Sequence, residues 1–223
     1  MKHNEQEMVY LKEEINLMWK LVISQLEKAK TALLENNIGL AHEVITLEKR
    51  VNAFELKIDS NCENYIALYT PVAIDLRLVL SIMKISITLE RIGDYAVGIA
   101  RHVADNDCFE NSSNLYDEME LERMFDILQS MMTESFVSLN TETSANAGKI
   151  LAKDKEVNEI HKNALQLLGD YIEQHPSFAA CGLKIASLVR KMERIGDHCS
   201  NIVEEIVFYI EAKVLKHKGK IEE

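Results

Sequence analysis

Apolar residues recur at steps of three and four along most of this chain, which is the spacing of one face of an α-helix. The longest such runs cover 82–103 and 185–209, and shorter ones cover 44–58 and 157–171. They are typical of core-facing stripes on long helices, with a short connection at Asn36-Asn37. We expect helices over the ranges 4–35, 39–69, 71–106, 115–145, 148–174 and 176–217.

The motifs of the chain occur twice in the same order. The string E-R-I-G-D stands at 90–94 and again at 193–197. Upstream of these copies, Pro71 and Pro176 hold corresponding places, and each fits the first position of a helix, where a missing N–H costs nothing. Before each proline comes a D/E-K-x-V-N string, at 48–52 and 154–158. Such an order indicates a duplicated unit.

The repeat and the helix pattern together predict an all-α fold. We expect two tandem, sequence-related three-helix bundles of long antiparallel helices, one over 1–108 and the other over 115–223. The stretch 106–114 is rich in Asn, Asp and Ser and is predicted to link them.

The composition excludes several other classes of protein. Eight glycines and two prolines are too few for the turns of a β-sandwich, and there is no glycine-rich phosphate-binding string. A net charge of -11 argues against binding to nucleic acid or to anionic lipid. No apolar run is long enough to span a membrane, no signal peptide is evident, and the cysteines form no C-x-x-C pair. We therefore expect a cytoplasmic protein with reduced cysteines that meets membranes only through partners.

Several acidic residues come directly after a residue of a core stripe, which places them about 100° further around the helix. We call this strip beside the core stripe the shoulder of the helix. In an antiparallel pair these shoulders face one another, and counting from the prolines places them level. We predict one groove of metal ligands in each half, formed by Glu48, Glu55, Asp59, Glu90 and Asp94 in the first and by Asp154, His161, Glu193 and Asp197 in the second, with Asn52 and Asn158 beside them.

Carboxylates that converge in this way repel one another, and a divalent or trivalent cation offsets the repulsion. Oxygen ligands with an occasional imidazole suit Fe, Zn, Mn or Mg, in a mononuclear or multinuclear site open to an anion such as phosphate. Arg91 and Arg194 are expected to neutralise neighbouring acids. Gly93 and Gly196 are expected to allow close helix approach, and His102 and His198 to lie on the surface.

The repeated D/E-K-x-V-N, the P-x-x-x-D-L-R of 71–77 and the repeated E-R-I-G-D resemble the PhoU family over nearly the whole chain. The resemblance implies a non-enzymatic, often dimeric protein with metal clusters on E/D-x-x-x-D motifs. It also implies an adaptor between the ATPase subunit of the phosphate ABC transporter (PstB-like) and a sensor histidine kinase (PhoR-like), which represses the phosphate-starvation response. The pairs carried over are Glu55–Asp59, Glu90–Asp94 and Glu193–Asp197. The fifth helix departs with His161 and Leu165, and D-L-R is absent from the second half.

Three other interpretations stay open. A PhoU-like protein could serve a different phosphate transporter. A ferritin-like di-metal enzyme would need Glu-x-x-His motifs that point into the bundle, and neither half has one. An inert helical scaffold would bind no metal.

Overall fold

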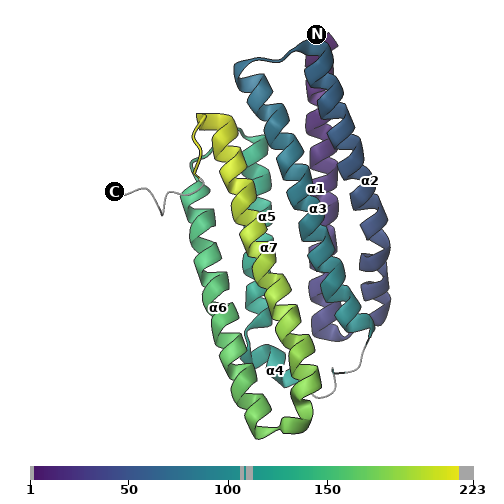
Figure 1. The fold of residues 1–223 in the computed structure, drawn as a ribbon, viewed down its shortest axis with the longest axis vertical. Helices are drawn as coiled ribbons and strands as arrows, with labels where there is room; N and C mark the ends of the chain where they lie inside the picture. The colour runs from purple at the N-terminus through teal and green to yellow at the C-terminus, as the bar shows by residue number, and fades with distance from the viewer. Residues whose placement is uncertain (1–2, 106–107, 109–112, 216–223) are drawn as a thin grey trace.

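The computed structural model describes residues 3–105, 108 and 113–215. Its elements follow in chain order (Figure 1): α1 His3–Glu35, α2 Ile38–Tyr69, α3 Ala73–Ala104, α4 Ser113–Glu118, α5 Leu121–Asn140, α6 Ala147–Gln174, the 3-10 turn η2 Pro176–Phe178 and α7 Ala179–Glu211. No strand occurs among these residues, so the all-α prediction is confirmed.

Figure 1 shows α1, α2 and α3 as one antiparallel bundle beside a second bundle made of α5, α6 and α7. The predicted apolar stripes form the interiors: Ile82, Ile85, Leu89 and Ile92 of α3 are fully buried, as is Ile195 of α7. The tandem arrangement predicted from the repeat is therefore present. Most of the predicted linker, 106–107 and 109–112, lies outside the described residues.

The two bundles share one continuous core, because α3 packs along α7 and α1 contacts α5. The single tryptophan, Trp19 of α1, is fully buried and donates from Nε1 to the backbone oxygen of Met132 on α5, at 3.2 Å. On the other side of the interface, Lys84 of α3 pairs with the buried Glu205 of α7, at 3.0 Å. The halves are therefore two repeats in sequence but one packed body in structure.

The D-L-R motif belongs to this interface. Arg77 donates from Nε to the backbone oxygen of Tyr209 at 3.1 Å, and Ser81 donates to the backbone oxygen of Glu205 at 3.2 Å. Arg77 thus satisfies a carbonyl near the C-terminus of α7, where such groups lack a partner within the helix.

Some predicted helix ends are wrong for local reasons. The connection at Asn36-Asn37 is present as expected, and Asn37 caps α2 by accepting from the Leu40 N–H at 3.0 Å. The first proline, however, precedes α3 rather than opening it, because Thr70 and Ala73 take left-handed backbone angles and the chain turns between them. Pro176 begins η2, which leads into α7.

The predicted helix 115–145 is divided. Glu120 has a φ of 55°, and this left-handed residue separates α4 from α5 without any glycine or proline to signal it. At the other end, the side chains of Asn140 and Thr141 donate to the backbone oxygens of Phe136 and Val137, both at 2.8 Å. Side chains that bond nearby carbonyls in this way compete with the helix, and α5 ends there. The last helix ends at Glu211, before its predicted end at 217.

The expectation that all cysteines are reduced is wrong for one pair. Cys108 forms a disulfide with Cys181, near the start of α7. The pairing joins residues from different halves, which no spacing in the sequence could indicate. Cys62 and Cys199 are free and buried, as expected. No helix in the described part of the chain is long and apolar enough to cross a membrane.

Candidate functional site: carboxylate clusters on two helix pairs

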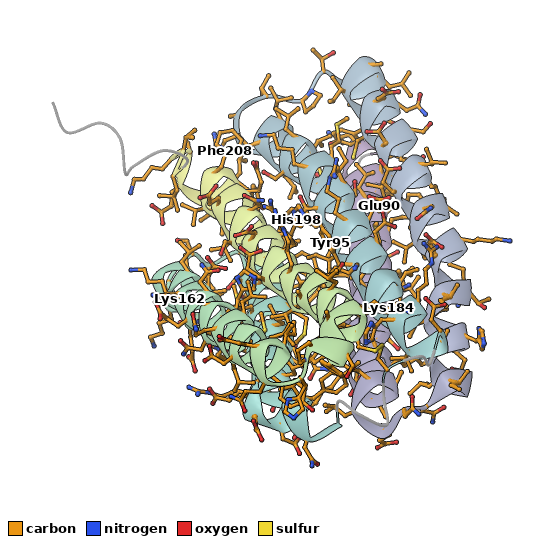
Figure 2. The ribbon with its side chains drawn as sticks, turned by 60° about the horizontal axis from the view of Figure 1, so that its bottom comes forward. Glu90, Tyr95, Lys162, Lys184, His198 and Phe208 are labelled. Atoms are coloured by element: carbon orange, nitrogen blue, oxygen red, sulfur yellow. A yellow bond between two sulfur atoms is a disulfide. The ribbon has the colours of Figure 1, made fainter. Side chains whose placement is uncertain are left out.

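The first acidic cluster lies between α2 and α3, where Figure 2 labels Glu90. Burial raises the pKa of Glu90, and the charges of Asp94 and Glu55 raise it further while Arg91 opposes them. Burial likewise raises the pKa of Asp94, with the charge of Glu48 as the next cause. Carboxylates from both helices are therefore close enough to penalise each other's ionised forms.

Arg101 also takes part in this cluster, although it was not among the predicted site residues. Its Nη2 lies 3.1 and 3.3 Å from the two carboxylate oxygens of Glu48. Arg101 follows Asp94 by seven residues, or about two helical turns, so it reaches α2 from the same face of α3. That spacing is the only signal in the sequence that could have identified it.

The second cluster lies between α6 and α7 and consists of Asp154, Glu193 and Asp197. Burial raises the pKa of Asp154 to about 6, and the charges of Asp197 and Glu193 contribute to the rise. The side chains of Asn158 and Ser200 oppose this rise. Oδ2 of Asp154 accepts a long hydrogen bond from Asn158 at 3.4 Å, while Oδ1 is buried with no well-aligned hydrogen-bond donor among the described residues. A buried carboxylate oxygen without a donor is a place where a cation would be stabilised.

The glycines of the two E-R-I-G-D motifs bring the facing helices together, as expected. A Cβ on Gly196 would lie 3.0 Å from Asp154 Oδ1 and 3.2 Å from Cγ1 of Val157. A Cβ on Gly93 would lie 3.1 Å from Gln25 Oε1 and 3.4 Å from Cγ1 of Val51. The glycine between the two acids thus lets α6 approach α7 at the height where the carboxylates meet.

The remaining predicted ligands lie further out. Asp59 acts electrostatically on the thiol of Cys62, a turn beyond Glu55 along α2. His161 lines a groove on the side of α6 and α7 that also contains Glu193, and its Nε2 is buried without a partner. Among the described residues, no three His, Cys, Asp or Glu side chains converge tightly enough to enclose an ion as they stand. The side chains define two open clusters rather than closed coordination spheres.

The arginines of the E-R-I-G-D motifs lie beside acidic residues, as expected. The two histidines that were expected on the surface instead make contacts between helices. Arg194 binds Asp197 at 3.0 Å and lies 4.0 Å from Glu193. His198, however, stacks on Tyr95 across the interface between α7 and α3, with ring centroids 5.6 Å apart (Figure 2). His102 bonds the hydroxyl of Tyr116 on α4 at 3.0 Å. Both prediction errors arise because the packing of one half against the other is not visible in a repeat.

Each cluster can offer several carboxylate oxygens to a hard or borderline cation on a partly exposed shoulder. In the first, the suitable groups are Glu48, Glu55, Glu90 and Asp94. In the second, they are Asp154, Glu193 and Asp197, while His161 lies in the adjoining groove that also contains Glu193. Burial and neighbouring carboxylates raise the pKa values of Glu90, Asp94 and Asp154, and a cation bound in either cluster would lower these pKa values.

Comparison with known proteins supports the repeat and the fold. The PhoU domain family model matches residues 15–103 and again 121–206. A phosphate-specific transport system accessory protein PhoU homolog from Pseudomonas putida is 32% identical over 91% of this chain and 78% of its own length. The phosphate-specific transport system accessory protein PhoU of Escherichia coli K12 is 30% identical over 96% and 87%.

Two solved structures have the same fold as this chain. The crystal structure of PhoU from Pseudomonas aeruginosa superimposes with a TM-score of 0.88 and 32% identity, covering 94% of this chain and 99% of that one. The phosphate transport system regulatory protein PhoU from Streptococcus pneumoniae shares the fold, with a TM-score of 0.85 at 23% identity over 96% and 99% of the two chains. With both sequence repeats and the whole fold matched, this chain belongs to the PhoU family.

Proposed function

We propose that this chain is an accessory protein of a phosphate-specific transport system and acts as a non-enzymatic, cytoplasmic regulator. The support is its membership of the PhoU family and its similarity to phosphate-specific transport system accessory proteins, which it matches over most of their length. The proposed role is an adaptor, as a homodimer, between the ATPase subunit of the phosphate transporter (PstB-like) and a sensor histidine kinase (PhoR-like). In this role it represses the starvation response while phosphate is abundant.

We further propose that each half binds a divalent or trivalent metal ion, or a small cluster of ions, at its carboxylate groove. The observation that carries this proposal is the twice-repeated meeting of carboxylates whose pKa values are raised. A bound cation supplies positive charge that removes the mutual repulsion. The glycines and Arg101 hold the helices and carboxylates in place, and the outer faces of the helices remain free for partners.

A di-metal bundle enzyme fits these positions poorly. The carboxylates of both clusters are partly exposed on helix shoulders, whereas the interiors of the bundles are built from apolar side chains. A buried di-metal centre requires carboxylates and histidines that project inward from facing helices. An oxygen-consumption assay of the purified protein with ferrous iron checks this directly, and we expect no catalytic turnover.

Deletion of the gene tests the regulatory role. In phosphate-rich medium the deletion strain should express alkaline phosphatase and other phosphate-starvation genes, and a plasmid copy should restore repression. If alkaline phosphatase in the deletion strain stays at the wild-type level in phosphate-rich medium, the proposal is contradicted. Capture of the tagged protein from membranes, followed by identification of its partners, distinguishes this transporter and kinase from a different phosphate transporter.

A further inference from the structure

A groove of about 520 Å³ runs along α6 and α7 on the outer side of the second cluster. It is lined by His161, Leu165, Ala186, Ser187, Arg190, Glu193 and Arg194. Two of these residues are arginines one helical turn apart, and only one is acidic. The net charge of the chain is -11, so any attraction of an anion here has to come from these local groups.

Polar groups in this groove can still donate hydrogen bonds to a ligand. Arg190 is exposed and takes part in none of the ion pairs found among the described residues. Arg194 uses one Nη for Asp197, which leaves further N–H groups of its guanidinium. Ser187 Oγ accepts from Lys191 Nζ at 2.7 Å, so its own proton can be donated outward. His161 Nε2 is buried without a partner.

The repeat shows that this lining is specific to the second half. When the two copies are aligned on E-R-I-G-D, Arg190 corresponds to Ile87. When they are aligned on the V-N motifs, His161 and Leu165 correspond to Glu55 and Asp59. The first half therefore has two carboxylates and an isoleucine where the second has an imidazole, a leucine and a guanidinium. The exchange removes two carboxylates from this side of the second half and adds a guanidinium.

Glu193 is the acidic member of the lining, and its charge opposes an anion. Arg194 lies 4.0 Å from Glu193, so this charge is partly offset within the groove. Lys191, one turn before Arg194 and bonded to Ser187, adds positive charge at the same end. Arg190 and Lys191 therefore supply positive charge beside Ser187, while the charge of Arg194 is shared with Asp197 and Glu193.

We propose that this groove binds a tetrahedral oxyanion of the phosphate type. The guanidinium groups of Arg190 and Arg194 provide charge-assisted hydrogen bonds, and the hydroxyl of Ser187 and the imidazole of His161 donate to the remaining oxygens. The volume admits either free phosphate or a phosphoryl group on a small carrier molecule. The site goes beyond the proposed regulatory function and does not require a metal in the neighbouring cluster.

Calorimetric titration of the full chain as purified, and again after its metal is removed with a chelator, tests this proposal. Inorganic phosphate and glycerol phosphate are titrated separately, and we expect saturable binding of at least one. Tighter binding of inorganic phosphate identifies the free ion as the natural form, whereas tighter binding of glycerol phosphate indicates a carried phosphoryl group. Absence of saturable binding for both overturns the proposal, whatever the metal content of the native protein.

A variant inside the groove and a control outside it test whether the anion binds at this place. Arg190→Gln should weaken the affinity about tenfold, the effect of removing one charge-assisted hydrogen-bond partner. Lys162→Gln removes one positive charge from an exposed residue of α6 (Figure 2). Lys162 is not part of the lining of the groove, so this variant should change the affinity less than twofold. Equal weakening by both variants would show diffuse attraction and contradict the site. If Arg190→Gln melts below the wild type, Arg190→Lys replaces it, with an expected three- to tenfold loss.

Discussion

At the scale of single residues, Asp154 carries the clearest electrostatic penalty in the described chain. Its pKa rises to about 6, so the folded state binds a proton more tightly than the unfolded state does. This group therefore lowers stability above about pH 6, and the penalty disappears as the pH falls below the ordinary aspartate pKa of about 4. A nearby cation should cancel the same penalty at neutral pH.

Asp154→Asn should consequently stabilise the metal-free protein at pH 7. We expect a gain of about 1 kcal/mol, because the partly exposed carboxylate is screened by solvent. The gain should shrink as the pH approaches 4. Thermal or urea unfolding between pH 4 and 8 measures it, with Asp117→Asn, an exposed aspartate of α4, as the control. Destabilisation of the chelated protein by Asp154→Asn would contradict the assignment of repulsion at this site.

The cysteines allow a second prediction at this scale. Unfolded protein that has not been reduced should show two reactive thiols, those of Cys62 and Cys199, and reduction should raise the count to four. In the native state both free thiols should react slowly, because burial raises the pKa of Cys62 to about 12 and that of Cys199 in the same direction. Thiol titration checks both statements. Four thiols without reduction would show that Cys108 and Cys181 are not joined.

At the scale of helices, the pattern of the sequence predicts the long elements well and their junctions less well. The stripes on α3 and α7 are strongly periodic, and nearly every predicted member is buried. The division between α4 and α5 depends on a left-handed Glu120, which no sequence signal marks. The carboxylate shoulders were predictable because they repeat, whereas Arg101, the stacked Tyr95–His198 pair and the Cys108–Cys181 disulfide depend on contacts between distant segments.

The approach of α6 to α7 depends on Gly196, and a pair of alanine variants tests it. At Gly196 a Cβ would press on the fully buried Val157, so Gly196→Ala should cost about 1–2 kcal/mol as an overpacked contact. At Gly169, in the same helix pair, a Cβ meets nothing within 4 Å. There the better helix propensity of alanine should add about 0.5–1 kcal/mol.

Urea unfolding of the two proteins compares these free energies. Opposite signs for the two variants support a packing role for the glycine between the acids. If Gly196→Ala and Gly169→Ala raised the free energy of unfolding equally, α6 and α7 would accommodate the added Cβ without loss of stability, and Gly196 would have no packing role.

At the scale of the whole molecule, the shared core predicts a single cooperative unfolding transition. Trp19 lies at the contact between halves, bonded to Met132 and packed edge-on against Phe136 at 5.8 Å. Its fluorescence should therefore change at the same urea concentration as the helical circular dichroism signal. Two separated transitions would indicate halves that fold independently.

The two carboxylate clusters also set the most direct test of the central claim, that this PhoU-family chain binds metal in both halves. Elemental analysis of protein purified without chelator should find bound Fe, Zn, Mn or Mg. Glu90→Ala combined with Asp94→Ala should remove the metal of the first half, and Glu193→Ala combined with Asp197→Ala that of the second. Metal-free wild-type protein, or unchanged metal content in both double variants, would contradict the account.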